Sequence, residues 1–265
     1  TSLMSKIMKS AYDLDSLIMQ HAEDLDLSKN GSVNDGIIAT KLGLQGISSL
    51  SEKIIIERDL SLLEDFNCRY HISQISSLKS VNIIKQKKDN VNFTTGVSIN
   101  NLSLNENDIG EFRTFLKLSP PLRTEEDRIS LIDGINKNLI DVIVSDHKPE
   151  DEESKRLTFS QAATGASGIE TLLPLALELF HNGSIKLNQI IKLLTSNPAK
   201  ILKIDKGTLS IGNDADFCIV DLYKPWVVKE EKMKSKSKNT CIDGKKLQGI
   251  VTNTFVKGEE LFKIQ

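Results

Sequence analysis

The sequence has few cysteines. Its 265 residues include three, Cys68, Cys218 and Cys241, which are widely spaced and odd in number. None belongs to a C-x-x-C pair, so the pattern argues against a disulfide framework and is typical of a reducing compartment. We therefore expect a cytoplasmic protein. Cys68 and Cys218 lie in apolar, strand-like runs, so both are expected in the core.

Long apolar runs are also missing. No stretch of about 18 apolar residues occurs, which excludes a transmembrane helix, and no signal peptide is visible. The chain begins with Thr1 rather than Met and enters a helical pattern almost at once. We therefore expect that the true amino terminus lies upstream.

A strong charge of either sign is absent as well. The 34 Lys and Arg residues nearly balance the 36 Asp and Glu residues, and the net charge is −2. This balance gives no electrostatic argument for binding nucleic acid or an anionic membrane. The basic run at residues 229–238 is interrupted by two glutamates and favours a solvated loop. Neither nucleic acid nor a membrane is expected as a partner.

What is present suits a folded protein, because 39% of the residues are hydrophobic and 26% are charged. The length allows one large barrel-type domain or two small ones. Four segments have strand-like patterns, at residues 17–20, 67–76, 91–102 and 139–145. Helical patterns separate them, at residues 51–66, 77–88 and 124–135. Alternation of this kind predicts a parallel sheet with right-handed crossover helices.

The carboxyl-terminal part has a different pattern. Helices are predicted at residues 170–181 and 184–194, and the composition becomes turn-rich from Lys206. Residues 217–222 and 249–262 resemble antiparallel strands. We therefore expect a barrel domain at residues 1–205 and a small β unit at residues 206–265.

Polar residues follow two of the predicted parallel strands. Asp146 and His147 come after an apolar run, and His21 follows another. In barrel enzymes the carboxyl ends of the strands hold the chemistry. Residues 29–46 form a long predicted loop, and loops of that length are usually functional. The sequence also predicts helix caps at Asn105 and at Thr124 with Asp127.

Several motifs together resemble one family. They are, in chain order, His21-Ala22-Glu23-Asp24, Glu57-Arg58-Asp59-Leu60, Pro120-Pro121-Leu122-Arg123, Asp146-His147-Lys148-Pro149, Gly165-Ala166-Ser167-Gly168-Ile169-Glu170-Thr171, Ser196-Asn197-Pro198-Ala199-Lys200, and Lys206-Gly207-Thr208-Leu209 with Asp214-Ala215-Asp216. The ordered set, from about residue 10 to the end, resembles dihydroorotase of class I (the multifunctional-complex type), a cyclic amidohydrolase of the amidohydrolase superfamily. The resemblance implies a TIM-barrel-like (β/α)₈ metal-dependent hydrolase fold, whose second half this chain supplies, with a small β-sandwich portion.

The resemblance also implies zinc and reversible closure of carbamoyl aspartate to dihydroorotate in pyrimidine biosynthesis. His21 matches a metal ligand on the fifth strand. Asp146 matches the eighth-strand residue that binds metal and shuttles the proton. Gln74 stands where the sixth strand normally supplies a ligand histidine, and a neutral amide is a poor zinc donor beside imidazole. His71 matches a histidine that does not bind metal.

Other positions depart from the family pattern. The substrate-contacting asparagine is replaced by Ser119. The eighth-strand motif usually reads Asp-His-Ala-Pro-His, and Glu150 replaces the last histidine, which meets the substrate carboxylate. Gly165 to Gly168 correspond to residues that hold substrate through backbone groups. The first four strands, with their His-x-His metal ligands, are absent from the chain. Three explanations stay open: the sequence is a fragment, another chain completes the barrel, or the fold is decayed.

Two functions remain open. The first is a zinc-dependent cyclic amidohydrolase acting on dihydroorotate, impaired or inactive as the chain stands. The second is a non-catalytic, dihydroorotase-like subunit that assembles with aspartate carbamoyltransferase and stabilises it. A hydantoin or allantoin is an open alternative substrate, and a homo-oligomer is implied by the resemblance.

Purely structural roles are also open for the same residues. His21 could be a hydrogen-bonded residue at a strand end, and Asp146 a cap or an ion-pair partner. Arg58 and Arg123 favour structural ion pairs, and His71 favours a structural role. The glycine turn could be a hinge.

Overall fold

The computed structural model describes residues 1–264. Its centre is a four-stranded parallel sheet in the order β1-β4-β5-β6. The strands are β1 (Leu17–Gln20), β4 (Arg69–Ile75), β5 (Thr94–Ser98) and β6 (Val142–Val144). All three pairings are parallel, so the carboxyl ends of the strands lie at one edge. The predicted alternation of parallel strands and helices is confirmed.

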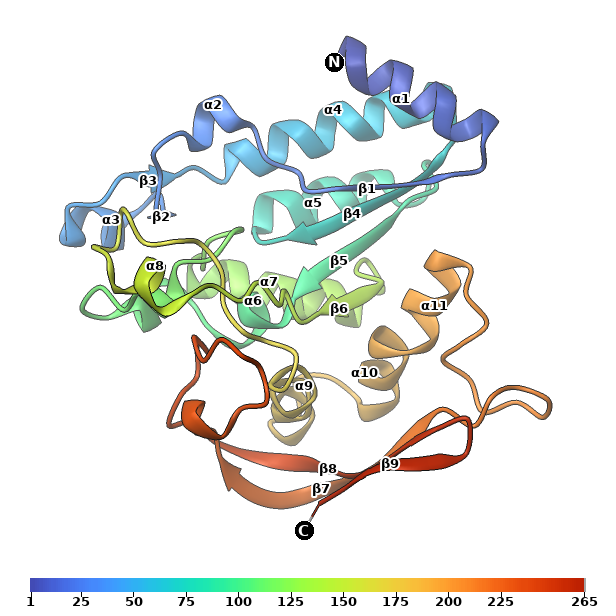
Figure 1. Cartoon of the computed structure of the whole chain (residues 1–265). Coiled ribbons are helices and arrows are strands. Elements are labelled where there is room, and N and C mark those ends of the chain that lie inside the picture. The colour runs from blue at the N-terminus through green and yellow to red at the C-terminus, as the bar shows by residue number, and fades with distance from the viewer. Residues whose placement is uncertain (265) are drawn as a thin grey trace.

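Helices connect and cover these strands (Figure 1). The bounds are α1 (Ser2–Asp13), α4 (Leu50–Phe66), α5 (Leu78–Lys87), α6 (Ile99–Ser103) and α7 (Glu125–Asn136), with 3-10 turns at Glu106–Ile109 and Thr114–Leu116. Both predicted caps are present. Thr124 and Asp127 form a capping box at the start of α7, and Asn105 and Asp108 form another at the first 3-10 turn. Each box satisfies backbone N–H groups that a helix start leaves unpaired.

The strand predicted at residues 91–102 is shorter than expected. β5 ends at Ser98, whose side chain accepts a hydrogen bond from the Asn100 N–H and caps α6. Asn100 and Asn101 therefore lie in the first turn of a short helix, and both are buried. A serine at a strand end favours helix initiation, and the apolar pattern of the following residues concealed the change.

The long segment after β1 is ordered by two short parallel strands, β2 (Val33–Asn34) and β3 (Gly46–Ile47). The short helices α2 (Leu25–Ser28) and α3 (Ile37–Leu42) flank β2. Arg123, 3% exposed, ties this segment to the barrel. Its guanidinium donates to Asn34 Oδ1 at 2.9 Å and to Ser76 Oγ at 3.1 Å.

The carboxyl-terminal part contains α8 (Glu152–Arg156), α9 (Leu172–His181), α10 (Leu187–Leu194) and α11 (Ser196–Leu202). A separate antiparallel sheet follows, with β7 (Phe217–Val227), β8 (Lys246–Val256) and β9 (Glu259–Lys263), and a 3-10 turn at Glu230–Lys232 between its first two strands. It packs on α9, at the end of the molecule opposite α1 (Figure 1). The domain division at residue 205 stays a prediction.

The core is a single cluster of buried side chains that spans the parallel sheet and its helices. Cys68 belongs to it at 3% exposure. The prediction for Cys218 is wrong, because this thiol is exposed on β7, where most residues are exposed as well. An apolar run identifies a strand but does not show which strands have both faces covered. No described helix is long and apolar enough to cross a membrane.

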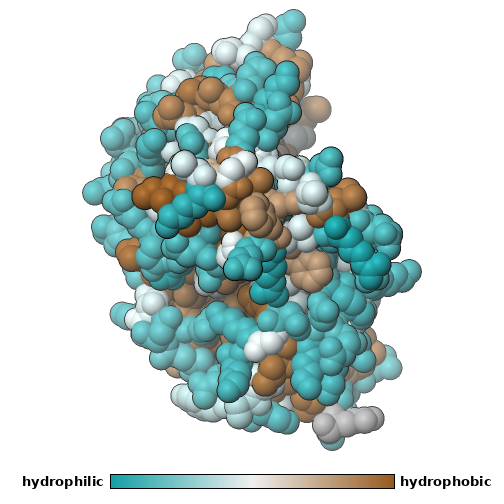
Figure 2. Space-filling view, turned by 90° about the vertical axis from the view of Figure 1, so that its left-hand side faces the viewer, coloured by the Kyte–Doolittle hydropathy of each residue, from teal (hydrophilic) through white to brown (hydrophobic). Residues whose placement is uncertain are grey.

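The surface is mostly polar. Figure 2 shows the side of the molecule that carries α3 and α8, where hydrophobic residues form scattered patches between hydrophilic ones. Scattered apolar residues are normal on a folded protein and mark no site by themselves.

Candidate active site at the strand ends

Gln74 and Asp146 meet at the carboxyl edge of the sheet. Gln74 lies near the end of β4, and Asp146 comes two residues after β6. The Gln74 amide donates a hydrogen bond from Nε2 to Asp146 Oδ1 at 2.9 Å. The backbone of Asp146 has a φ of +48°, which is uncommon for a residue with a side chain and is most often found where structure or function requires it.

His21 comes directly after β1, at the same edge. Its Nε2 lies 3.3 Å from Ser119 Oγ and 3.4 Å from Glu23 Oε2. The hydrogen bond with Glu23 raises the pKa of His21, and burial opposes the shift. The same contact lowers the pKa of Glu23. The structure therefore brings His21 and Ser119 together, with Glu23 favouring the imidazolium form.

Asp146 is partly removed from water. Burial raises the pKa of its carboxyl group, while the Gln74 hydrogen bond and the positive charges of His21 and Lys148 act in the other direction. Desolvation disfavours the charged carboxylate. A raised carboxyl pKa suits a group that exchanges protons near neutral pH.

The donor chemistry at this edge does not make a complete zinc site. Among residues 1–264, no three His, Cys, Asp or Glu side chains are grouped closely enough to hold a metal ion. His21 and Asp146 are donors of the type that zinc prefers, whereas Gln74 offers only an amide. Zinc sites in proteins normally take three or four protein ligands. The residues present therefore do not fit the metal by themselves.

The glycine turn lies beside Asp146. Gly168 donates its N–H to His147 Nδ1 at 3.1 Å, and Gly165 donates to the Lys117 carbonyl at 2.9 Å. A Cβ atom at Gly168 would lie 2.3 Å from the Ser145 carbonyl oxygen. Close packing against β6 explains why glycine stands at this position. The N–H groups of Gly165 and Gly168 already donate to protein acceptors. Substrate binding by these two glycines stays a prediction.

Glu150 and Ser119 line different cavities. Ser119 lines a cavity of about 260 Å³ together with Glu23 and Lys148. Glu150 lines a larger cavity of about 890 Å³ together with His147. The carbonyl oxygen of Glu150 accepts a hydrogen bond from Ser237 Oγ, which fixes the backbone on that side.

Sequence reasoning missed Glu23 and Lys148 as individual residues of the site. Both belong to motifs of the family resemblance. Glu23 comes two residues after His21, and Lys148 comes two residues after Asp146. Asn239 was also missed, because it is remote in sequence. Its side-chain amide donates to the Gly165 carbonyl at 3.1 Å, and its backbone carbonyl oxygen accepts from the Ser167 N–H at 3.1 Å. No short-range pattern could indicate these contacts.

The remaining residues have structural partners. His71 is 2% exposed, and its Nδ1 lies 2.8 Å from Thr94 Oγ1. Burial lowers the pKa of His71 to about 4. Arg58 pairs with Asp59 at 2.6 Å, as predicted. For Arg123 the prediction of an ion pair is wrong within the described residues, since its partners are neutral oxygens of Asn34, Ser76 and Ile47.

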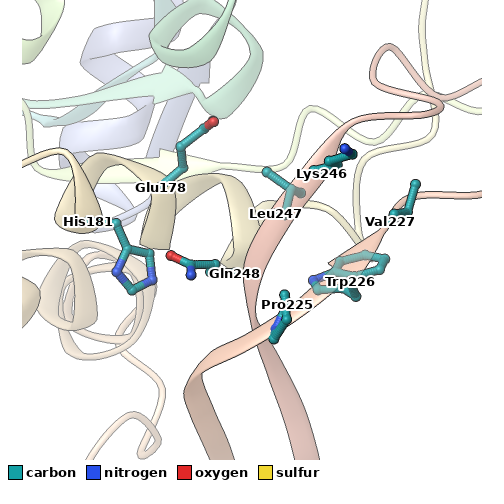
Figure 3. A pocket seen from close by; sticks show the side chains of 8 residues that line it. All are labelled: Glu178, His181, Pro225, Trp226, Val227, Lys246, Leu247 and Gln248. Carbon is teal, nitrogen blue, oxygen red and sulfur yellow. The ribbon is translucent and has the colours of Figure 1, made fainter.

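Another cavity lies away from the strand ends, between α9 and the β7–β8 pair (Figure 3). It measures about 490 Å³ and contains none of the predicted site residues. His181 lies beside it at the end of α9, and its ring packs near Phe180 and Tyr223. Within residues 1–264, His181 forms no ion pair with a carboxylate of the kind that His21 forms with Glu23.

The chain is similar to known proteins along almost its whole length. A family model described as "Amidohydrolase family" matches residues 1–261. A protein named dihydroorotase from Ehrlichia chaffeensis is 43% identical over 254 residues, which cover 95% of this chain and 57% of that protein. A dihydroorotase from Anaplasma phagocytophilum is 39% identical over 264 residues, which cover 99% of this chain and 59% of that protein. The chain thus spans less than two thirds of the length of these relatives.

Solved structures give the same fold. An L-hydantoinase (dihydropyrimidinase) from Arthrobacter aurescens aligns with a TM-score of 0.86 and 27% identity, over 99% of this chain and 60% of that one. A dihydropyrimidinase from Brevibacillus agri aligns with a TM-score of 0.87 at 20% identity, which supports the fold alone. The predicted TIM-barrel-like fold is confirmed, and the chain covers the later part of the barrel.

Proposed function

Because this chain belongs to the amidohydrolase family, we propose that it is a dihydroorotase-like cyclic amidohydrolase whose hydrolytic activity is impaired as the chain stands. The observation that carries the proposal is the hydrogen bond from Gln74 to Asp146. The Gln74 amide stands where the family has a metal-binding imidazole. It also donates a hydrogen bond to the Asp146 carboxylate, the group expected to act on the substrate.

The reaction class places defined demands on the site. Opening a cyclic amide needs a polarised carbonyl, an activated water and a group that moves a proton to the leaving nitrogen. In the family, zinc supplies the first two when bound. We assign the third role to Asp146, because burial raises the pKa of its carboxyl group, as is common for groups that carry protons.

The substrate class follows from the relatives. The two relatives described above are named dihydroorotases, and the L-hydantoinase neighbour also bears the name of an enzyme acting on cyclic amides. A small cyclic amide is therefore the proposed substrate, and dihydroorotate is the first candidate. A cavity of about 260 Å³ beside Ser119 suits a small ligand.

A rate comparison tests this proposal. Dihydroorotate ring opening is measured for the wild-type chain and for Asp146→Asn, both with added zinc. Asp146→Asn keeps the size of the side chain but removes the proton carrier. The wild-type rate is expected to lie within about threefold of the variant, since a working acid–base group contributes roughly 100-fold or more. A wild-type rate far above that of Asp146→Asn would contradict the proposal that hydrolytic activity is impaired.

The alternative is a non-catalytic subunit that assembles with aspartate carbamoyltransferase. It is favoured by an intact scaffold beside altered site positions. The buried Glu52 carboxylate still accepts hydrogen bonds from Ser76 and Ser77, whereas Gln74 and Glu150 depart from the family pattern. Assembly is tested by size-exclusion chromatography with the purified transcarbamoylase, and the eluted complex also reports the proposed homo-oligomer. Separate elution at micromolar concentrations removes this alternative.

A further inference from the structure

Lys148 brings a positive charge to the cavity beside Ser119. The motif that this stretch resembles usually has alanine between the histidine and the proline, whereas this chain has lysine. Lys148 lines the cavity of about 260 Å³ that also contains Ser119 and Glu23. Glu150, which replaces the carboxylate-binding histidine of the motif, lines the other cavity.

The other charges of this smaller cavity are already engaged. Glu23 pairs with His21 at 3.4 Å. Lys117 is 8% exposed, and its ammonium donates to the carbonyl oxygens of Ser160 and Ala162, both at 2.8 Å. In residues 1–264, the Lys148 ammonium makes no ion pair within 4.0 Å. It is therefore the cation that remains available to a ligand.

The backbone of Lys148 is bonded to the glycine turn, and its side chain passes close to Gly165. A Cβ atom at Gly165 would lie 2.8 Å from Lys148 Cγ and 2.9 Å from its Cβ. The Lys148 N–H donates to the Ala166 carbonyl at 2.9 Å. Gly165 therefore leaves room for the stem, and Lys148 as a whole is exposed.

We propose that the Lys148 ammonium binds the carboxylate of an anionic cyclic amide and sets a preference for anionic over neutral rings. The inference rests on the proposed substrate class, but it does not require hydrolysis. A charge-assisted hydrogen bond to a carboxylate is strong enough to discriminate between ligands that differ only in that group. The role that the motif gives to a histidine at position 150 is thereby taken by a residue two positions earlier.

Binding calorimetry with two probes tests the inference. Dihydroorotate carries the carboxylate, and dihydrouracil is the same ring without it. The wild-type chain is expected to bind dihydroorotate at least about tenfold more tightly. Lys148→Met keeps most of the stem and should remove that preference while leaving dihydrouracil binding unchanged. Lys148→Arg should retain the preference, and Lys79→Met, at an exposed lysine of α5, should change neither affinity.

The outcomes separate this inference from the proposed function. Equal binding of the two rings by the wild-type chain overturns the role of Lys148 but leaves cyclic-amide recognition intact. A preference that persists in Lys148→Met also overturns it. If neither ring binds, the proposed substrate class itself fails, and the inference fails with it.

Discussion

Gln74 Nε2 donates a hydrogen bond to Asp146 Oδ1 at 2.9 Å, joining the end of β4 to the residue that follows β6. The contact gives the partly buried Asp146 carboxylate a hydrogen-bond donor. A buried carboxylate needs hydrogen-bond donors or a charge partner. The amide supplies a donor, but it cannot replace imidazole as a zinc ligand.

The first prediction concerns this pair. Gln74→His should raise the affinity for zinc by about tenfold or more, because an imidazole would join His21 and Asp146. Competition with a chromophoric chelator measures the change. Gln161→His, at an exposed position, is the matched control and should leave the affinity unchanged. Equal affinities for the wild type and Gln74→His would contradict the assignment of Gln74 to a ligand position.

The second prediction concerns pH and His71. Burial lowers the pKa of His71 to about 4, against 6.5 for the ordinary side chain. The unfolded state therefore binds more protons between these values, and the free energy of unfolding should fall as the pH drops from 6.5 towards 4. Urea unfolding at several pH values measures the slope. His71→Gln should show a shallower dependence, and an unchanged slope would refute the buried neutral imidazole.

The third prediction concerns Arg123. Arg123→Met removes the donors that satisfy Asn34 and Ser76 while keeping an apolar stem. The free energy of unfolding should fall by about 2–4 kcal/mol, since several buried acceptors lose their partners. Arg156→Met breaks an exposed pair with Glu152 and should cost less than about 1 kcal/mol. Denaturant unfolding compares the two, and similar losses would exclude a special role for the buried guanidinium.

The fourth prediction concerns the glycine turn. Gly168→Ala places a methyl group 2.3 Å from the Ser145 carbonyl, so the turn or β6 must shift. We expect a loss of about 1–3 kcal/mol in stability. Gly36→Ala is the control, because its nearest contact would be 3.4 Å, to the side chain of Asn34. Thermal unfolding of both variants checks the difference, and a Gly168→Ala protein as stable as the control would contradict the close packing.

Local signals in the sequence predicted the elements well. The caps at Asn105 and Thr124 depend on neighbouring residues, so they could be recognised without the fold. His21 and Asp146 were predicted at strand ends because each follows an apolar, strand-like run. The early end of β5 at Ser98 was not predicted, since an apolar pattern continues through the following short helix.

Contacts between distant segments could not be predicted. The cavity that Glu150 lines depends on residues 235–239, which are more than 80 positions away in the sequence. The exposure of Cys218 depends on which face of β7 is covered. Motif spacing fixes the order of residues along the chain, but the direction of each side chain comes from tertiary packing.

The most direct test of the central claim is the zinc content of the wild-type chain after equilibration with the metal and removal of the excess. The account predicts less than roughly one zinc per two chains, because no group of three His, Cys, Asp or Glu side chains that could hold a metal occurs in residues 1–264. A stoichiometry of about one zinc per chain or more, lost in Asp146→Asn, would show a working metal site and contradict the account.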